Sequence, residues 1–118
     1  MKVYVYNKCS TCKSALQFLK KNAIEFDQTE IDLTPPTKDE LEQMLSFNDG
    51  DLRKLFNTSG ALYKEMELSR KMPSLTLREA FDLLTKFGML VKRPFLIDKK
   101  IGIVGFNETK WKDLLLNE

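Results

Sequence analysis

The stretch Lys-Val-Tyr-Val-Tyr-Asn-Lys-Cys-Ser-Thr-Cys-Lys at residues 2–13 decides how this chain folds. Residues 2–6 alternate and are rich in β-branched and aromatic side chains, which is typical of a strand. From residue 11 to 22 the apolar positions follow helical spacing, so that one face of a helix is buried. The sequence therefore predicts that Cys9 and Cys12 lie at a strand-to-helix turn.

These two cysteines are the only ones in the chain. The first would stand at a helix N-terminus, where unpaired N–H groups and the positive end of the helix dipole stabilise a thiolate. Cys9 is therefore the candidate nucleophile. Cys12 lies one turn later on the apolar face, which makes it the more buried thiol and the candidate to resolve a mixed disulfide. The alternative is that both are inert small residues of the core.

The composition is that of an ordinary globular protein, with 118 residues, 42% hydrophobic and 31% charged. We expect a single domain over residues 1–118. The formal net charge of +2 does not argue for nucleic acid, and no apolar run reaches the length of a membrane span. The N-terminus lacks a signal-peptide core, so we expect a cytoplasmic protein. In that compartment a close cysteine pair is catalytic or sensory rather than structural.

The chain contains no histidine, which excludes Cys–His dyads, Ser–His–Asp triads and histidine metal sites. Two cysteines cannot build a four-cysteine zinc site, and we expect no metal. Activation of Cys9 must then come from the helix terminus and from nearby cations. Lys8 and Lys13 are neighbours in sequence, although lysines are mostly solvated.

The remaining pattern predicts the order β-α-β, then helices, then β-β-α. A second strand at 24–33 would complete a right-handed parallel unit. Two capping boxes, Thr37 to Glu40 and Thr76 to Glu79, each open a helix. The other expected elements are short helices at 52–56 and 62–68, a C′ glycine at Gly88, strands at 94–97 and 101–104 joined by 98–100, and a last helix capped by Asn107. We therefore expect an α/β fold, a mixed four-stranded sheet flanked by helices, with a helical insertion at about 37–90.

Four motifs carry a resemblance: Cys9-Ser10-Thr11-Cys12, residues 56–60 (Phe-Asn-Thr-Ser-Gly), residues 88–94 (Gly-Met-Leu-Val-Lys-Arg-Pro) and Val104-Gly105-Phe106. Together they resemble the arsenate reductase (ArsC)-related family, which includes the Spx and MgsR transcriptional regulators. The resemblance covers nearly the whole chain. It implies a thioredoxin-like fold.

The resemblance also implies roles. Cys9 would be the nucleophilic thiol, and Arg93 would face it and hold its anion or an oxyanion substrate. Pro94 resembles the family's cis-proline, which sets the loop opposite the thiol. The simpler alternatives are a solvated Arg93 and an ordinary trans proline that opens a strand.

The sequence departs from the pattern of the arsenate reductases, which surround the cysteine with three arginines. Only Arg93 has a clear counterpart here, because Asn57, Thr58 and Ser59 match the second position and the third lies near Gly105. Residues 57–60 are most simply a turn, and Gly105 most simply permits a tight strand end. Those reductases also carry a serine in place of Cys12. In the regulators a glycine of the insertion touches RNA polymerase, and Gly50 is the nearest match.

We therefore expect a cytoplasmic thiol–disulfide oxidoreductase that uses the Cys9–Cys12 pair. Arg93 and Pro94 would line its substrate site. We expect no bound cofactor, and glutathione, glutaredoxin or thioredoxin would act as redox partner and electron donor. We also expect a monomer with no direct contact with nucleic acid or membrane. Two alternatives stay open: a redox-sensing regulator of the Spx/MgsR kind that binds the RNA polymerase α subunit, and an arsenate reductase.

Overall fold

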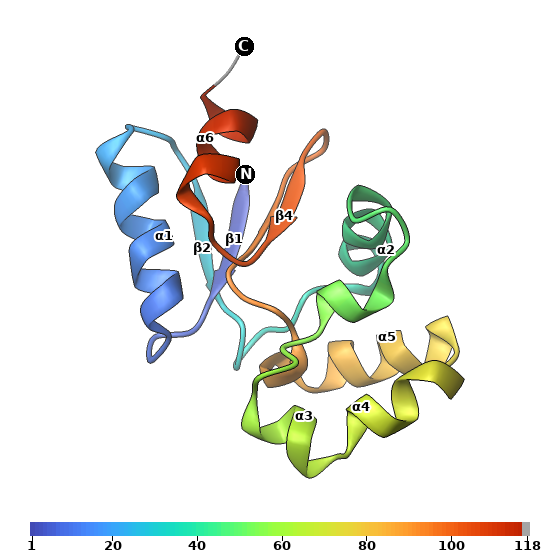
Figure 1. Cartoon of the computed structure of the whole chain (residues 1–118). Coiled ribbons are helices and arrows are strands. Elements are labelled where there is room, and N and C mark those ends of the chain that lie inside the picture. The colour runs from blue at the N-terminus through green and yellow to red at the C-terminus, as the bar shows by residue number, and fades with distance from the viewer. Residues whose placement is uncertain (117–118) are drawn as a thin grey trace.

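A mixed four-stranded sheet in the order β2-β1-β3-β4 forms the centre of the computed structural model, which describes residues 1–116 (Figure 1). The strands are β1 (Lys2–Val5), β2 (Asp27–Glu30), β3 (Phe95–Ile97) and β4 (Gly102–Val104). β1 pairs with β2 in parallel and with β3 in antiparallel orientation, and β4 pairs antiparallel with β3. The mixed sheet predicted from the sequence is confirmed.

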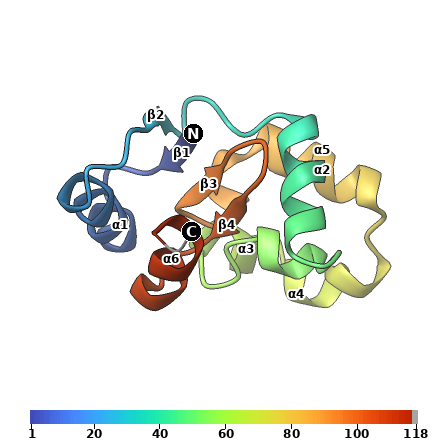
Figure 2. The same ribbon diagram turned by 90° about the horizontal axis from the view of Figure 1, so that it is seen from above.

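Helices cover both faces of this sheet, and Figure 2 shows α1 and α6 on one side with α2 and α5 on the other. The α-helices are α1 (Ser10–Lys21), α2 (Lys38–Phe47), α3 (Ala61–Glu65), α4 (Leu68–Lys71), α5 (Leu77–Lys86) and α6 (Glu108–Leu115). Short 3-10 helices are η1 (Leu52–Leu55), η2 (Met72–Ser74) and η3 (Gly88–Leu90). All elements between β2 and β3 are helical, as the sequence predicted. None of the helices in residues 1–116 has the length and apolar character needed to span a membrane.

β1 is buried on both faces because it separates two apolar clusters. Val3 and Val5 pack with the apolar face of α1 and with Trp111 of α6. Tyr4 points the other way, into the cluster built by the helical insertion. Successive side chains of a strand point to opposite faces, so four residues are enough to join both halves of the core.

Two predicted elements differ from the structure. The second strand covers residues 27–30 and not 24–33, because it can pair only along the length of β1. The last bond of this pairing is donated by the Ile31 N–H to the Val5 carbonyl at 2.9 Å, and the chain turns after it. The helix expected at 62–68 is two short helices, α3 and α4. Glu67 between them has a left-handed φ of 54°, which ends a right-handed helix.

Gly88 follows the C-cap residue Phe87, the C′ position predicted from the sequence. Its φ is not in the left-handed region that usually requires glycine at this position. The structural reason is a close approach, since a Cβ at this position would collide with the carbonyl oxygen of Ile31. Gly88 therefore lets the end of α5 lie directly against the chain that leaves β2.

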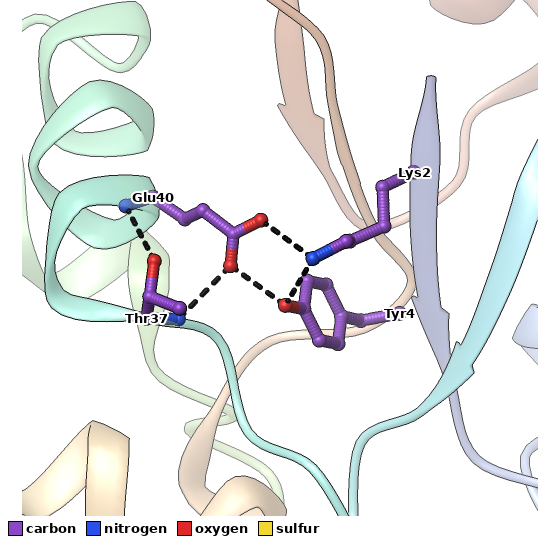
Figure 3. Close-up of polar contacts among 4 residues, drawn as sticks. All are labelled: Lys2, Tyr4, Thr37 and Glu40. Carbon is purple, nitrogen blue, oxygen red and sulfur yellow. Dashed lines mark hydrogen bonds and ion pairs between the residues drawn. The ribbon is translucent and has the colours of Figure 1, made fainter.

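A polar network joins the first strand to the insertion (Figure 3). Glu40 completes the predicted capping box of α2, since its Oε1 accepts from the Thr37 N–H at 2.9 Å. The same carboxylate accepts from the Tyr4 hydroxyl at 2.6 Å and pairs with Lys2 Nζ at 3.1 Å. Burial alone would raise the pKa of Glu40, but the bonds from Tyr4, Thr37 and Lys2 outweigh it and lower that pKa. The network thus ties β1 to the N-terminus of α2.

Replacing Glu40 with glutamine should lower the free energy of unfolding by about 1–2 kcal/mol, because glutamine can retain the capping box but not the charged bonds to Tyr4 and Lys2. The pKa of Glu40 is lowered on folding. Its contribution is therefore present above the unfolded value of about 4.3 and is lost as the pH falls through the folded value. Urea unfolding at pH 7 and below pH 4 measures both effects.

Glu79→Gln is the matched control. Glu79 completes the second capping box with Thr76 but is fully exposed, and within the described chain it has no hydrogen bond or ion pair with another element. We expect it to cost clearly less than Glu40→Gln. Equal losses from the two substitutions would show that the contacts to β1 contribute nothing.

Candidate functional site

The pairing of β1 with β3 brings the two predicted halves of the site together. Tyr4 lies opposite Phe95, so β1 ends and β3 begins at the same end of the sheet. The chain leaves β1 toward Cys9 at this end and enters β3 from Pro94. The peptide bond between Arg93 and Pro94 is cis, which confirms the conformation that the resemblance implied.

Cys9 is the N-cap residue of α1. Its sulfur accepts a hydrogen bond from the backbone N–H of Cys12 at 3.3 Å, and its own N–H donates to the Tyr6 carbonyl at 3.1 Å. Burial alone would raise the pKa of this half-buried thiol. The hydrogen bonds from Cys12 and the charge of Arg93 outweigh that effect, so the pKa of Cys9 is lowered.

Cys12 has the opposite character. It is 1% exposed and packs with Ala15 and Leu19 in the cluster below α1. Burial, followed by its hydrogen bond to Cys9, raises the pKa of Cys12 to about 12. Both thiols are free in the structure. The motif therefore contains one thiol of lowered pKa and one buried thiol of raised pKa, and the greater burial of Cys12 is the one expected from the sequence.

Arg93 lies close enough to Cys9 for its charge and a side-chain hydrogen bond to lower the pKa of that thiol. Its guanidinium carbon is 5.3 Å from the centre of the Tyr6 ring, and Nη1 donates to the Met89 carbonyl at 3.2 Å. Its Nε is buried and has no hydrogen-bond partner among the described residues. The arginine is therefore held in position while its buried Nε donor stays unused. No motif in the sequence indicates that Tyr6 and Met89 hold this arginine.

The other cations and turns named from the sequence are not among the groups that shift the pKa of Cys9. Lys8 and Lys13 are exposed, and neither contributes to the pKa shift of Cys9. Residues 57–60 form a turn whose Asn57 N–H donates to the Leu90 carbonyl at 2.7 Å. Gly105 has a φ of 73° and ends β4 by donating its N–H to the Pro94 carbonyl at 2.8 Å. The simpler structural interpretations of these positions are the ones that fit the structure.

Three other observations concern the binding of ligands, metals or partners. A cleft of about 840 Å³ lies beside β4, and neither cysteine nor Arg93 lines it. Among residues 1–116, no three His, Cys, Asp or Glu side chains gather closely enough to hold a metal ion. Gly50, the nearest match to the regulators' polymerase contact, has a φ of 77° and open space around it.

Replacing Arg93 with alanine should raise the pKa of Cys9 and slow its alkylation by iodoacetamide at pH 7 by roughly threefold to tenfold. The loss of thiolate is partly offset by the greater nucleophilicity of a more basic thiol. The ultraviolet absorbance of the thiolate against pH gives the pKa, and mass spectrometry identifies the alkylated residue. Arg78→Ala, which removes a guanidinium from the exposed start of α5, is the control and should leave the rate unchanged. Equal alkylation rates in Arg93→Ala and Arg78→Ala would show that Arg93 does not act on Cys9.

Similar proteins of several kinds are known. The chain is 37% identical over 110 residues to the uncharacterized protein YusI of Bacillus subtilis, covering 93% of each chain. It is 29% identical to the regulatory protein MgsR of the same organism, covering 88% of this chain and 81% of MgsR. It is 26% identical to the global transcriptional regulator Spx of Streptococcus pyogenes, covering 96% of this chain and 83% of Spx.

Solved structures of similar proteins superpose closely on this chain. An ArsC family related protein from Bacteroides fragilis superposes with a TM-score of 0.88 at 38% identity, covering 96% of this chain and 97% of the other. A possible arsenate reductase from Streptococcus mutans gives a TM-score of 0.87 at 37% identity, covering 96% and 95%. The fold is thioredoxin-like, as the resemblance implied. With a family model that matches residues 4–114, the chain belongs to the ArsC family.

Proposed function

We propose that this protein is a thiol–disulfide oxidoreductase in which Cys9 attacks and Cys12 resolves. The observation that carries the proposal is the 3.3 Å hydrogen bond from the Cys12 N–H to the Cys9 sulfur at the N-terminus of α1. It gives one thiol a lowered pKa while its partner, one turn away, stays protonated. This difference in pKa suits a thiol–disulfide exchange in which one sulfur attacks the substrate and the other later attacks the mixed disulfide.

In the first step the Cys9 thiolate attacks one sulfur of a substrate disulfide. A mixed disulfide forms, and the other substrate sulfur leaves as a thiolate that takes up a proton. Arg93 holds the attacking sulfur through its charge, and the cis Arg93–Pro94 loop forms the opposite wall. The substrate is now half reduced and bound to the protein.

In the second step Cys12 loses its proton and attacks the Cys9 sulfur, which releases the second substrate thiol and leaves a Cys9–Cys12 disulfide. Part of what raises the pKa of Cys12 is its hydrogen bond to Cys9 and the charge on that sulfur. Both vanish once Cys9 is in the mixed disulfide, so the pKa of Cys12 falls when its attack is needed. Two electrons have passed to the substrate, and glutathione, glutaredoxin or thioredoxin must return them.

Arsenate reduction has less support. Arg93 is the one cation among residues 1–116 whose charge lowers the pKa of Cys9. At the positions where the arsenate reductases have their other arginines, the N–H groups of Asn57 and Gly105 are already donated to backbone carbonyls. A dithiol exchange needs only one stabilised thiolate and a resolving thiol, and both are present.

A coupled assay with bis(2-hydroxyethyl) disulfide tests the function. NADPH oxidation is followed with glutathione plus glutathione reductase, or with thioredoxin plus thioredoxin reductase. Turnover should vanish in Cys9→Ser, which has no attacking thiolate. Cys12→Ser should still attack and should accumulate a mixed disulfide at Cys9 that mass spectrometry detects.

Ser14→Ala, on the exposed face of α1, is the control and should keep full activity. Arsenate is offered as substrate in parallel reactions. The proposal fails if Cys9→Ser retains disulfide turnover, or if wild-type protein reduces arsenate but no disulfide with either donor.

The second candidate is a redox-sensing regulator that binds the RNA polymerase α subunit, and it is favoured by the similarity to MgsR and Spx along most of this chain. In that case oxidation of Cys9 and Cys12 is a switch, and turnover is not required. Immobilised C-terminal domain of polymerase α should then retain the oxidised protein more strongly than the reduced one.

Gly50→Arg should abolish this retention if the exposed turn after α2 makes the contact. Asp49, its neighbour, also has a left-handed φ, of 56°, so Asp49→Asn supplies a control that fits the same backbone. Equal retention of oxidised, reduced and Gly50→Arg protein would exclude this function.

A further inference from the structure

The cleft beside β4 has features that the cysteine chemistry does not use. It has a volume of about 840 Å³ and runs along Gly102 to Phe106, between the end of α2 and helix α6. Figures 1 and 2 show β4 at the edge of the sheet with these helices on either side. The cleft therefore lies along β4, the outermost strand of the sheet, which pairs with β3 on one side only.

The backbone of β4 has unused hydrogen-bonding groups on this edge. The Ile101 carbonyl accepts from Asp98 and the Gly105 N–H donates to Pro94, so alternate residues of β4 face β3. Gly102 and Val104 must then direct their N–H and C=O groups outward, into the cleft. No partner for these outward groups occurs among residues 1–116. An unpaired strand edge of this kind is a template for another strand.

The side chains around the cleft select the partner. Its apolar residues include Phe47 of α2 and Phe106, which packs on Trp111 of α6. These two rings lie on opposite sides of the sheet, so each can receive side chains from one of the two faces of an added strand. Four cations line it, namely Arg53, Lys54, Lys92 and Lys110, against two carboxylates, Asp51 and Asp113. Arg53, Lys54 and Lys110 are exposed, and none of the four cations has an ion pair in the described part of the chain.

We propose that this cleft binds an extended acidic segment of a partner protein, which adds to β4 as a fifth strand. Main-chain bonds to Gly102 and Val104 would give the affinity, and the cations would select acidic side chains. A second copy of this chain does not fit, because it would bring the same four cations face to face. The cleft excludes both cysteines, so the proposal does not depend on the redox function.

The probe is a fluorescent six-residue peptide of alternating glutamate and valine, measured by anisotropy with the reduced full-length protein. We expect saturable binding that weakens with added salt, because the attraction is between exposed charges. The same peptide with lysine in place of glutamate should not bind. A version N-methylated at alternate residues keeps its charges but loses backbone donors, and it should bind at least roughly tenfold more weakly.

Hydrogen exchange followed by NMR identifies the strand addition. The outward amides of Gly102 and Val104 should become protected when the glutamate peptide binds, whereas the Ile103 amide, already turned toward β3, should change little. This pattern is a signature that a purely electrostatic contact would not produce.

Charge-reversal variants test the rim of the cleft. Arg53→Glu combined with Lys110→Glu should weaken peptide binding roughly tenfold or more. Arg78→Glu combined with Lys64→Glu makes the same change in net charge on exposed residues outside the cleft and should have little effect. Cys9→Ser should bind like wild type, which separates this result from any failure of the redox function.

Several outcomes would overturn the proposal. Equal binding of the N-methylated peptide would exclude strand addition. Full competition by millimolar phosphate without amide protection would indicate a site for small anions. Concentration-dependent dimerisation that protects the same amides without peptide would assign the edge to a second copy of the chain.

Discussion

The antiparallel pairing of β1 with β3 is the constraint on which the rest of this molecule depends. It sets Tyr4 opposite Phe95, so that the turn to Cys9 and the cis Arg93–Pro94 bond lie at the same end of the sheet. Some eighty residues separate these segments in the chain, and most of that length is the helical insertion. The insertion buries the Tyr4 face of β1 while α1 buries the other, so the same short strand positions the site and joins the two halves of the core.

Much of this could be predicted from the sequence because its signals are local. Both capping boxes form as expected, and the C-x-x-C sits at the strand-to-helix turn, since these patterns depend on residues only a few positions apart. The alternation of apolar and polar side chains likewise predicted the strands, and helical spacing of apolar residues predicted the helices. The positions of Cys9, Arg93 and Pro94 around one site came from the family resemblance, and the structure places them together.

What could not be predicted depends on contacts between distant residues. Nothing near Glu67 in the sequence indicates its left-handed backbone, which splits the expected helix. Gly88 was predicted to end a helix, yet glycine is needed there because the carbonyl of Ile31, just after β2, lies too close for a Cβ. The bonds from Lys2 and Tyr4 to Glu40, and the support of Arg93 by Tyr6 and Met89, likewise join residues that only the assembled sheet brings together.

The N-cap at Cys9 has a consequence for the energetics of the whole pair. A hydrogen bond that stabilises the thiolate also stabilises the reduced protein relative to the disulfide, because a disulfide sulfur carries no charge for that bond to stabilise. The helix is likewise best capped while the sulfur carries its charge. The turn that lowers the pKa of Cys9 thus also biases the equilibrium against its oxidised form. In this site the lowered pKa and the reluctance to stay oxidised have one physical origin.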